Sequence, residues 1–346
     1  MALTQRGKVV IGVVSAAVIA VLAILVFSGN APAPIQNLVD DVTGPEPCPL
    51  TGVERPNGDD APARPVIAVK VENSDAAYPL AGLERADVIY EEPVEGGITR
   101  FAALYQCAAP PRVGPVRSAR TTDPKILAPF ADEPLLAYSG ANPRVASIID
   151  EAGIVSLTET TANAAYTRDD ARSAPHNLFV SVRDLYPIAS QQGGDDAPPR
   201  SVFRYDDEIP TPSKPRTSAT VTFSTSTVVG WSWTDGRWHR LLEGTPMTAE
   251  NGAPVAVDNV VIQQVLVTDS DIVDVAGFPS PEVKLVGRGR AWVLRDGRLI
   301  VGRWRRDSLD EATIFETNAG DEISLAPGTT LVQLIPRDGG GVAFQR

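Results

Sequence analysis

A short acidic segment around a pair of glycines carries the residues best suited to proton transfer. Glu91, Glu92, Glu95 and Arg100 lie within ten positions of one another. In a hairpin, the cross-strand neighbours would be Glu91 and Arg100, or Glu92 and Thr99. An arginine keeps one carboxylate ionised while a less solvated carboxyl stays protonated, the division between base and acid that glycoside cleavage uses. We therefore predict that Glu92 and Glu95 are catalytic; the alternative is a solvated, salt-bridged hairpin edge.

Positive charge is concentrated in the segment at residues 112–120. A Gly-Pro pair within it predicts a turn, after which Arg117, Ser118 and Arg120 would lie where a helix begins. Backbone N–H groups and two guanidinium groups there could converge on one carboxylate or phosphate. The same arginines could instead neutralise the hairpin carboxylates, and the two roles are compatible.

His176 is the single histidine in the N-terminal half, so proton transfer by imidazole in that half must use it. A histidine in a loop can equally be a structural hydrogen-bonding group. A serine nucleophile, Ser118 or Ser139, would lack a surrounding Gly-x-Ser-x-Gly motif. The predicted catalytic residues are Glu92, Glu95 and His176, and the predicted ligand-binding residues are Arg100, Arg117, Ser118, Arg120, Tyr138 and Asn177.

Composition excludes several classes of function. The chain has 346 residues, 43 acidic against 31 basic side chains and a net charge of -12, which is unsuited to binding nucleic acid through phosphates. Two cysteines and two histidines cannot build a cysteine-rich zinc module. No calcium loop or dinucleotide fingerprint is present, so we expect neither a metal nor a cofactor.

The elements that must position these residues fall into two domains. Residues 65–73, 87–93 and 99–106 read as strands, the last two forming a hairpin, and helical periodicity alternates with them further on. This predicts an α+β or α/β N-terminal domain over residues 65–195. A proline-rich linker over residues 196–216 precedes a mostly-β C-terminal domain, a small barrel or sandwich, over residues 217–346.

An uncharged stretch at residues 9–28 predicts a transmembrane helix within an anchor at residues 1–29. Arg6 and Lys8 precede it, so the positive-inside rule places the N-terminus in the cytoplasm and the folded domains outside the plasma membrane. A cleaved signal peptide is the alternative. Residues 30–64 lack periodicity and are predicted to be a tether. Outside the cytoplasm Cys48 and Cys107 would form a disulfide, although two unpaired buried thiols are also possible.

Ordered motifs resemble one family. They read AVKVEN (68–73), DVIYEEPVEGGITRF (87–101), RVGPVRSAR (112–120), YSGANP (138–143) and APHNLF (174–179), then GRAWVLRDGRLIVGRW (289–304) and LAPGTTLVQLIP (325–336). In this order they resemble the DUF3048 (YerB-like) family of bacterial lipoproteins, including its C-terminal domain. The resemblance implies a two-domain, membrane-attached, extracytoplasmic protein but no substrate. A transmembrane segment stands where the family has a lipidated cysteine.

Two functions remain open at this point. The chain could be an enzyme acting on cell-wall glycan or peptide, with the arginines holding a substrate carboxylate. It could instead be a non-catalytic protein that binds an anionic wall component or a partner protein through the same cleft. The partners we expect are the membrane, through the N-terminal helix, and a wall glycan or peptide, with no nucleic acid.

Overall fold

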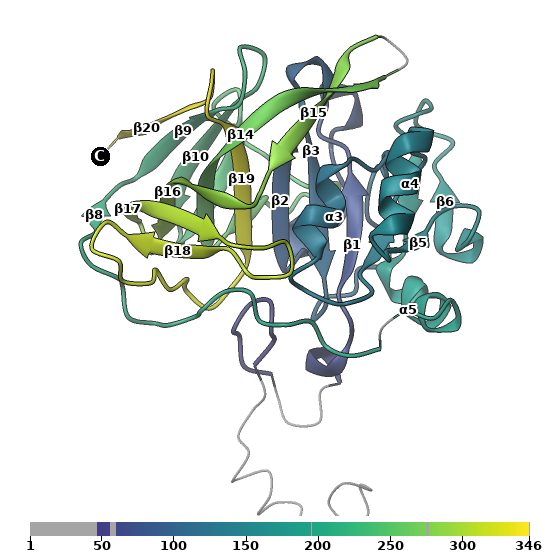
Figure 1. Ribbon diagram of the computed structural model, residues 1–346, viewed down its shortest axis with the longest axis horizontal. Helices are drawn as coiled ribbons and strands as arrows, with labels where there is room; N and C mark the ends of the chain where they lie inside the picture. Colours follow the sequence, from purple (N-terminus) through teal and green to yellow (C-terminus); the bar gives the residue numbers. More distant parts are fainter. Residues whose placement is uncertain (1–46, 56–59, 195, 275–276, 346) are drawn as a thin grey trace, which may run out of the picture. The chain divides into compact units, whose positions relative to one another are not determined.

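The computed structural model describes residues 47–55, 60–194, 196–274 and 277–345. A twelve-stranded sheet dominates it, with the order β18-β17-β16-β14-β19-β2-β3-β1-β4-β5, β15 beside β14 and β8 beside β17 (Figure 1). The N-terminal half supplies β1 (Ile67–Val71), β2 (Val88–Pro93), β3 (Thr99–Tyr105), β4 (Leu135–Ala137) and β5 (Val155–Leu157). The C-terminal half supplies β8 (Lys214–Pro215), β14 (Asn259–Val273), β15 (Pro279–Lys284), β16 (Gly287–Arg295), β17 (Arg298–Arg306), β18 (Ile314–Thr317) and β19 (Thr330–Pro336).

Strand β19 joins the two halves of the chain. It pairs in parallel with β14, where Asn259 opposes Thr330, and in parallel with β2, where Glu91 opposes Gln333. Its side chains from Thr330 to Ile335 are all buried, as expected for a strand covered on both faces. The central sheet is therefore continuous across the chain.

A second sheet covers one face of the first. Its order is β12-β11-β10-β9-β20, with β13 beside β11. Its strands are β9 (Ser218–Thr222), β10 (Val228–Thr234), β11 (Arg237–Leu242), β12 (Thr245–Pro246), β13 (Ala256–Val257) and β20 (Gly341–Gln345). Trp231 and Trp238 are fully buried in one core with Ile89 and Phe101 of the large sheet. These large aromatic side chains account for much of the buried apolar area between the sheets.

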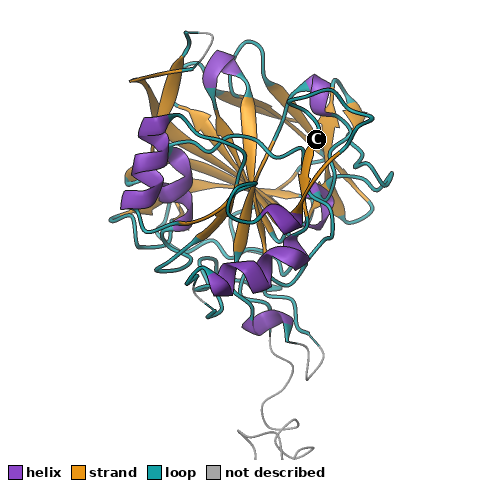
Figure 2. Ribbon diagram, turned by 90° about the vertical axis from the view of Figure 1, so that its right-hand side faces the viewer, coloured by secondary structure: helices purple, strands orange, loops and turns teal. Residues whose placement is uncertain are grey.

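Helices cover the N-terminal part of the large sheet on both faces (Figure 2). Helices α3 (Thr122–Leu127) and α4 (Pro143–Glu151) pack on the face opposite the second sheet, in the core that contains Ala68 and Leu104. Helix α5 (Val182–Gln191) and the two-stranded sheet of β6 (Tyr166–Arg168) and β7 (Leu178–Val180) belong to the other core. Single 3-10 turns occur at Ala61–Ala63, Asp75–Ala77, Leu83–Arg85, Glu95–Gly97 and Asn163–Ala165.

The predicted fold class, an α+β or α/β domain followed by a separate mostly-β domain and preceded by a transmembrane helix, is wrong. The described residues are mostly β, and strands of both halves share one sheet. Local periodicity cannot reveal that β19 returns to pair with β2, because that pairing joins residues far apart in the sequence. Within the described ranges no helix is long and apolar enough to span a bilayer. The predicted span at residues 9–28 lies outside those ranges.

The segments predicted to be tether and linker contact the fold where they are described. Leu50, within the predicted tether, is fully buried. In the predicted linker, the Arg200 N–H donates to the Phe130 carbonyl and the Asp206 N–H to the Leu325 carbonyl, both at 2.9 Å. The segment at residues 196–216 thus makes hydrogen bonds to both halves of the chain.

Candidate functional site

The polar residues predicted from the sequence gather where several strands end. Strands β1, β2 and β4 run in one direction, and β3 runs the opposite way between β1 and β2. The carboxyl ends of the three strands and the start of β3 therefore meet at one edge of the sheet. Crevices at the carboxyl ends of parallel strands are common ligand sites.

The charged side chains of the β2–β3 hairpin lie on both faces of the sheet. Glu92 opposes Arg100 and Glu91 opposes Phe101. The register is therefore shifted by one residue from the predicted Glu91–Arg100 or Glu92–Thr99 pairing, and such a shift exchanges the faces of all side chains. The connecting turn uses left-handed backbone at Gly96 and Gly97, with φ of 73° and 74°, which glycine adopts without steric cost.

Glu92 lies in a fully buried cluster with Lys70 of β1 and Asp123 of α3. The Lys70 Nζ donates to Glu92 Oε1 and to Asp123 Oδ1, the latter at 2.6 Å, and all three side chains are 0% exposed. Burial lowers the pKa of Lys70 to about 8, against the opposing effect of Asp123. In this arrangement Glu92, predicted to be catalytic, is out of reach of a substrate.

Glu95 occupies the turn of the same hairpin and borders a cavity of about 410 Å³ that also contains Phe223, Asp269 and Phe278. Its Oε2 accepts hydrogen bonds from Arg120 Nε at 2.9 Å and Nη2 at 2.5 Å, and Ser280 Oγ donates to Oε1. Burial alone would raise the pKa of Glu95, but Arg120 and Ser280 together hold it below the ordinary value. This carboxylate is therefore suited to act in its ionised form, as a base or charge partner.

His176 is oriented by Glu72, a residue just beyond β1. Its Nδ1 lies 2.9 Å from Glu72 Oε2, and the same carboxylate binds Arg117 and accepts from Ser74 Oγ at 2.8 Å. A carboxylate partner favours the proton on Nδ1, so Nε2 of the neutral ring is an acceptor. The imidazole is 25% exposed and Glu72 only 5%. The pair thus has the geometry of a base held in one tautomer.

Two guanidinium groups approach a single backbone carbonyl beside this pair. Arg100 Nη1 and Arg120 Nη1 both donate to the Ser118 carbonyl, at 3.4 and 3.3 Å. Among the described residues no carboxylate forms an ion pair with Arg100, which is 8% exposed. Burial, followed by the charges of Arg120 and Arg117, lowers the pKa of Arg100 to about 10. The site therefore holds more positive charge around Arg100 than its neighbours neutralise.

The other predicted ligand-binding residues have partners within the protein. The Ser118 hydroxyl donates to the Ser139 carbonyl at 3.0 Å, and the Tyr138 hydroxyl lies 3.0 Å from Ser156 Oγ. Asn177 accepts from Arg168 at 3.0 Å on an exposed edge. Ser118 thus contributes its carbonyl to the arginines, whereas Tyr138 and Asn177 stabilise the surrounding loops.

Sequence reasoning missed several members of the site. The sequence could have indicated Lys70 and Glu72, because these two charged residues interrupt the β-branched run of the first strand. All five residues of that strand are buried. Nothing in the sequence around Arg240 indicated that it belongs to the site. It binds Glu91 from 149 positions away, on the sheet face opposite Glu92.

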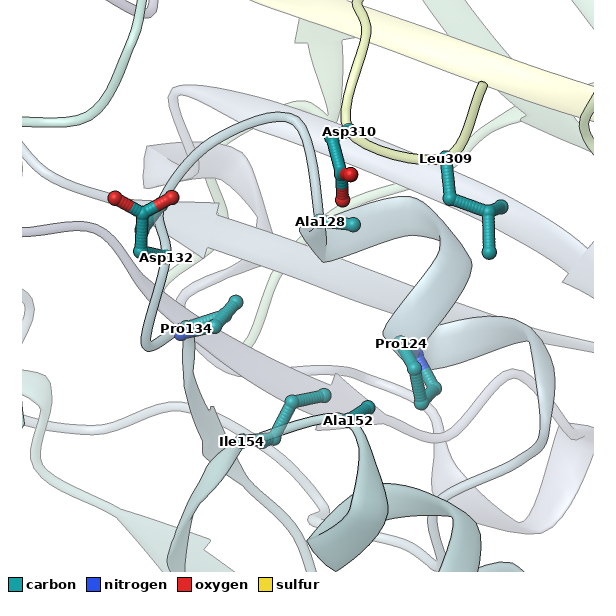
Figure 3. Close-up of a pocket in the computed structure, with 9 residues that line it drawn as sticks. Pro124, Ala128, Asp132, Pro134, Ala152, Ile154, Leu309 and Asp310 are labelled. Carbon is teal, nitrogen blue, oxygen red and sulfur yellow. The ribbon is translucent and has the colours of Figure 1, made fainter.

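Other cavities lie away from these residues, including one of about 570 Å³ beside Trp233 and one of about 550 Å³ beside Tyr186. A cavity of about 250 Å³ lies beside α3, where the Asp310 side chain extends toward Ala128 and Asp132 lies at the rim (Figure 3). None of the predicted site residues borders it. In the described ranges no three His, Cys, Asp or Glu side chains form a group that could hold a metal ion. Cys48 and Cys107 are joined in a disulfide with a Cα–Cα distance of 6.2 Å.

Comparisons with known proteins cover most of the chain. Residues 50–195 match the family described as "Protein of unknown function (DUF3048) N-terminal domain", and residues 219–332 match its C-terminal domain. "Putative lipoprotein YerB" of Bacillus subtilis (strain 168) is 25% identical over 308 residues, which cover 87% of this chain and 89% of the relative. The crystal structure of YerB from Bacillus subtilis superposes with a TM-score of 0.74 at 23% identity, over 86% of this chain and 99% of that chain, and so shares the fold.

Proposed function

The chain belongs to the DUF3048 family, whose description assigns no function, and from this premise we propose that it is a membrane-anchored, extracytoplasmic envelope protein that binds an anionic group. The binding groups are Arg100, Arg117 and Arg120. The ligand is a carboxylate or phosphate carried by a cell-wall glycan or peptide.

Two observations support the location. The relative from Bacillus subtilis bears the name of a lipoprotein, and lipoproteins are attached to membranes by their lipid. The disulfide between Cys48 and Cys107 is of a kind that persists in oxidising compartments and is rare in the cytosol.

The binding proposal depends on Arg100, whose buried guanidinium has no carboxylate ion-pair partner among the described residues. A guanidinium so little exposed ordinarily has a carboxylate partner, because removing its charge from water is costly. Arg100 instead has a long hydrogen bond to one carbonyl, and the charges of Arg120 and Arg117 act on it more strongly than those of Glu95 and Glu72. An oxyanion bound there would accept several N–H donors in the forked geometry that arginine provides.

Sedimentation of the full-length protein with purified cell-wall sacculi tests this proposal. The wild type is expected to sediment, and Arg100→Gln to bind at least about tenfold more weakly, because one charge-assisted contact is lost. Arg168→Gln, which removes an arginine paired with Glu159 on an exposed edge, is the matched control. Competition by inorganic phosphate would identify phosphate as the group recognised, and its absence would favour a carboxylate. Equal sedimentation of wild type and Arg100→Gln contradicts the proposal.

A second candidate function, turnover of the same wall material, is favoured by the His176–Glu72 pair. An imidazole fixed by a carboxylate and open at Nε2 can take a proton from a bound hydroxyl or water. Glu95 would then stabilise developing positive charge. Release of soluble muropeptides from sacculi by the wild type, and its loss in His176→Gln and Glu95→Gln, would establish an enzyme. Binding without release would leave the non-catalytic function.

A further inference from the structure

The buried cluster of Lys70, Glu92 and Asp123 contains an amine that neither proposed function uses. Lys70 lies on β1, Glu92 on β2 and Asp123 in the first turn of α3. The amine is the hydrogen-bond donor to both carboxylates, and none of the three side chains is exposed to any measurable extent. A nucleophile, an acyl carbon and a proton carrier therefore lie in contact in a water-excluded place.

If all three side chains are ionised, the charges and hydrogen-bonding atoms of this cluster are only partly balanced by one another. One ammonium faces two carboxylates, and Glu92 Oε2 is buried without a hydrogen-bond partner among the described residues. Desolvating three charges is costly, and the mutual attraction repays that cost only when the remaining lone pairs are satisfied. A neutral covalent product would remove two of the charges from the interior.

We propose that Lys70 and Asp123 form an intramolecular amide bond after folding, with Glu92 as the proton carrier. The bond would link β1 to α3 across 53 positions of the sequence. The arrangement of the three side chains in the structure is that of the reactants.

The reaction balances as a condensation. A proton passes from the Lys70 ammonium through Glu92 to Asp123 Oδ1, and the neutral amine attacks Cγ of the resulting carboxylic acid, forming the Nζ–Cγ bond. Glu92 then transfers a second proton from the nitrogen to Oδ1, which leaves as water when the Cγ–Oδ1 bond breaks. Ammonium and carboxylate are consumed, an amide and one water are formed, and Glu92 ends as it began. No oxidant, reductant or further reactant is needed.

Three features of the site favour this condensation. The Arg120 backbone N–H donates to Asp123 Oδ2 at 2.6 Å, so it can hold the oxygen on which negative charge develops. The pKa of Lys70 is lowered to about 8, so the neutral amine is accessible near physiological pH. Holding the reacting groups in contact replaces a bimolecular encounter by an intramolecular one, which can raise the effective concentration by many orders of magnitude.

The intact mass of the full-length protein, purified and reduced, tests the proposal directly. The expected value is lower than that of the sequence by the mass of one water molecule. Proteolytic mapping should then find one branched peptide in which Lys70 is joined to Asp123, and trypsin should fail to cut after Lys70. A mass equal to that of the unmodified sequence overturns the proposal, and so does a branched peptide that joins other residues.

Two variants separate the chemistry from the fold. Lys70→Arg keeps the positive charge but has no amine nucleophile, and it should retain the full mass. Glu92→Gln keeps both reacting groups and the side-chain shape, and it should retain the full mass while remaining folded by circular dichroism. Complete amide formation in Glu92→Gln would overturn the role of Glu92 as proton carrier. The wild-type mass decides the proposal even if a variant does not fold.

Discussion

The carboxylate of Glu91 is held by residues from both halves of the chain. Arg240 Nη1 and Nη2 bind its two oxygens at 2.8 Å each, and Gln333 Nε2 donates to Oε2 at 2.8 Å. Thr99 Oγ1 and Asn73 Nδ2 donate to Oε1 at 2.9 and 3.1 Å. The fully buried pair is therefore bidentate and almost completely hydrogen-bonded, the condition under which a buried ion pair is tolerated.

Breaking this pair should be costly. Arg240→Ala would leave Glu91 buried and uncompensated, so we expect the free energy of unfolding to fall by about 3–5 kcal/mol. Arg303→Ala, which removes a half-exposed partner of Glu316, should cost about 1 kcal/mol or less. Urea unfolding measures the loss of free energy of unfolding in both variants. Similar losses would show that the buried ion pair contributes no more to stability than the half-exposed one.

The ionised state of Glu95 predicts a dependence of stability on pH. The pKa of this carboxyl is lowered in the folded protein, so between the folded pKa and the unfolded value near 4.5 the unfolded chain binds more protons. The stabilisation is complete above the unfolded value and is lost as the pH falls through the folded pKa. We expect Glu95→Gln to lower the free energy of unfolding by about 2 kcal/mol at pH 7, with the difference from wild type disappearing in acid.

Urea midpoints measured from pH 7 to strongly acidic conditions would check the Glu95 prediction. Glu322→Gln is a suitable control, because the Glu322 side chain is exposed. A difference between wild type and Glu95→Gln that stays constant across this range would contradict the assigned ionisation.

Among the elements, the hairpin of β2 and β3 shows what local sequence can and cannot specify. Two strand-like runs on either side of a pair of glycines predict the hairpin, and its antiparallel pairing confirms that prediction. The register was not predictable, because it depends on the 3-10 turn at Glu95–Gly97, whose length the glycines alone do not set. The assignment of Glu91 and Glu92 to opposite faces follows from this register and was missed with it.

Residues distant in sequence limit what could be predicted of the candidate site. Arg117 and Arg120 were visible as a local concentration of charge, and the structure brings Arg120 to Glu95 as an ion pair. The partner of His176 is Glu72, 104 positions away, and nothing in the spacing indicates that contact. Local chemistry could thus be inferred from residue types, but the pairing of charges requires the fold.

The disulfide links the segment before the first strand to the end of β3. Cys48 and Cys107 are 59 positions apart, and closing a loop of this length in the unfolded chain predicts about 4 kcal/mol of stabilisation. We expect the Cys48→Ser, Cys107→Ser double variant to unfold at a correspondingly lower urea concentration. Wild type unfolded in the presence of reductant should match the variant, and an unchanged midpoint would contradict the prediction.

At the scale of the whole chain, the sharing of one sheet predicts that the halves stay together without a covalent connection. The segment around Thr211 is exposed, so a protease site inserted there should be cut without disturbing the strands. The two fragments should then elute together in native gel filtration under reducing conditions, and separate only in denaturant. Separation under native conditions would show that the parallel pairing of β19 with β2 is not stable by itself.

The position of β19 also matters while the chain is being made. More than 200 residues separate this strand from β2 in the sequence, yet the two strands are neighbours in the twelve-stranded sheet. The edge of β2 that pairs with β19 therefore stays unpaired until those residues have left the ribosome, and an open strand edge can recruit strands from other molecules. A chain that ends before Thr330 would present that edge permanently, so chaperones that shield unpaired strands should be needed most for copies that lack β19.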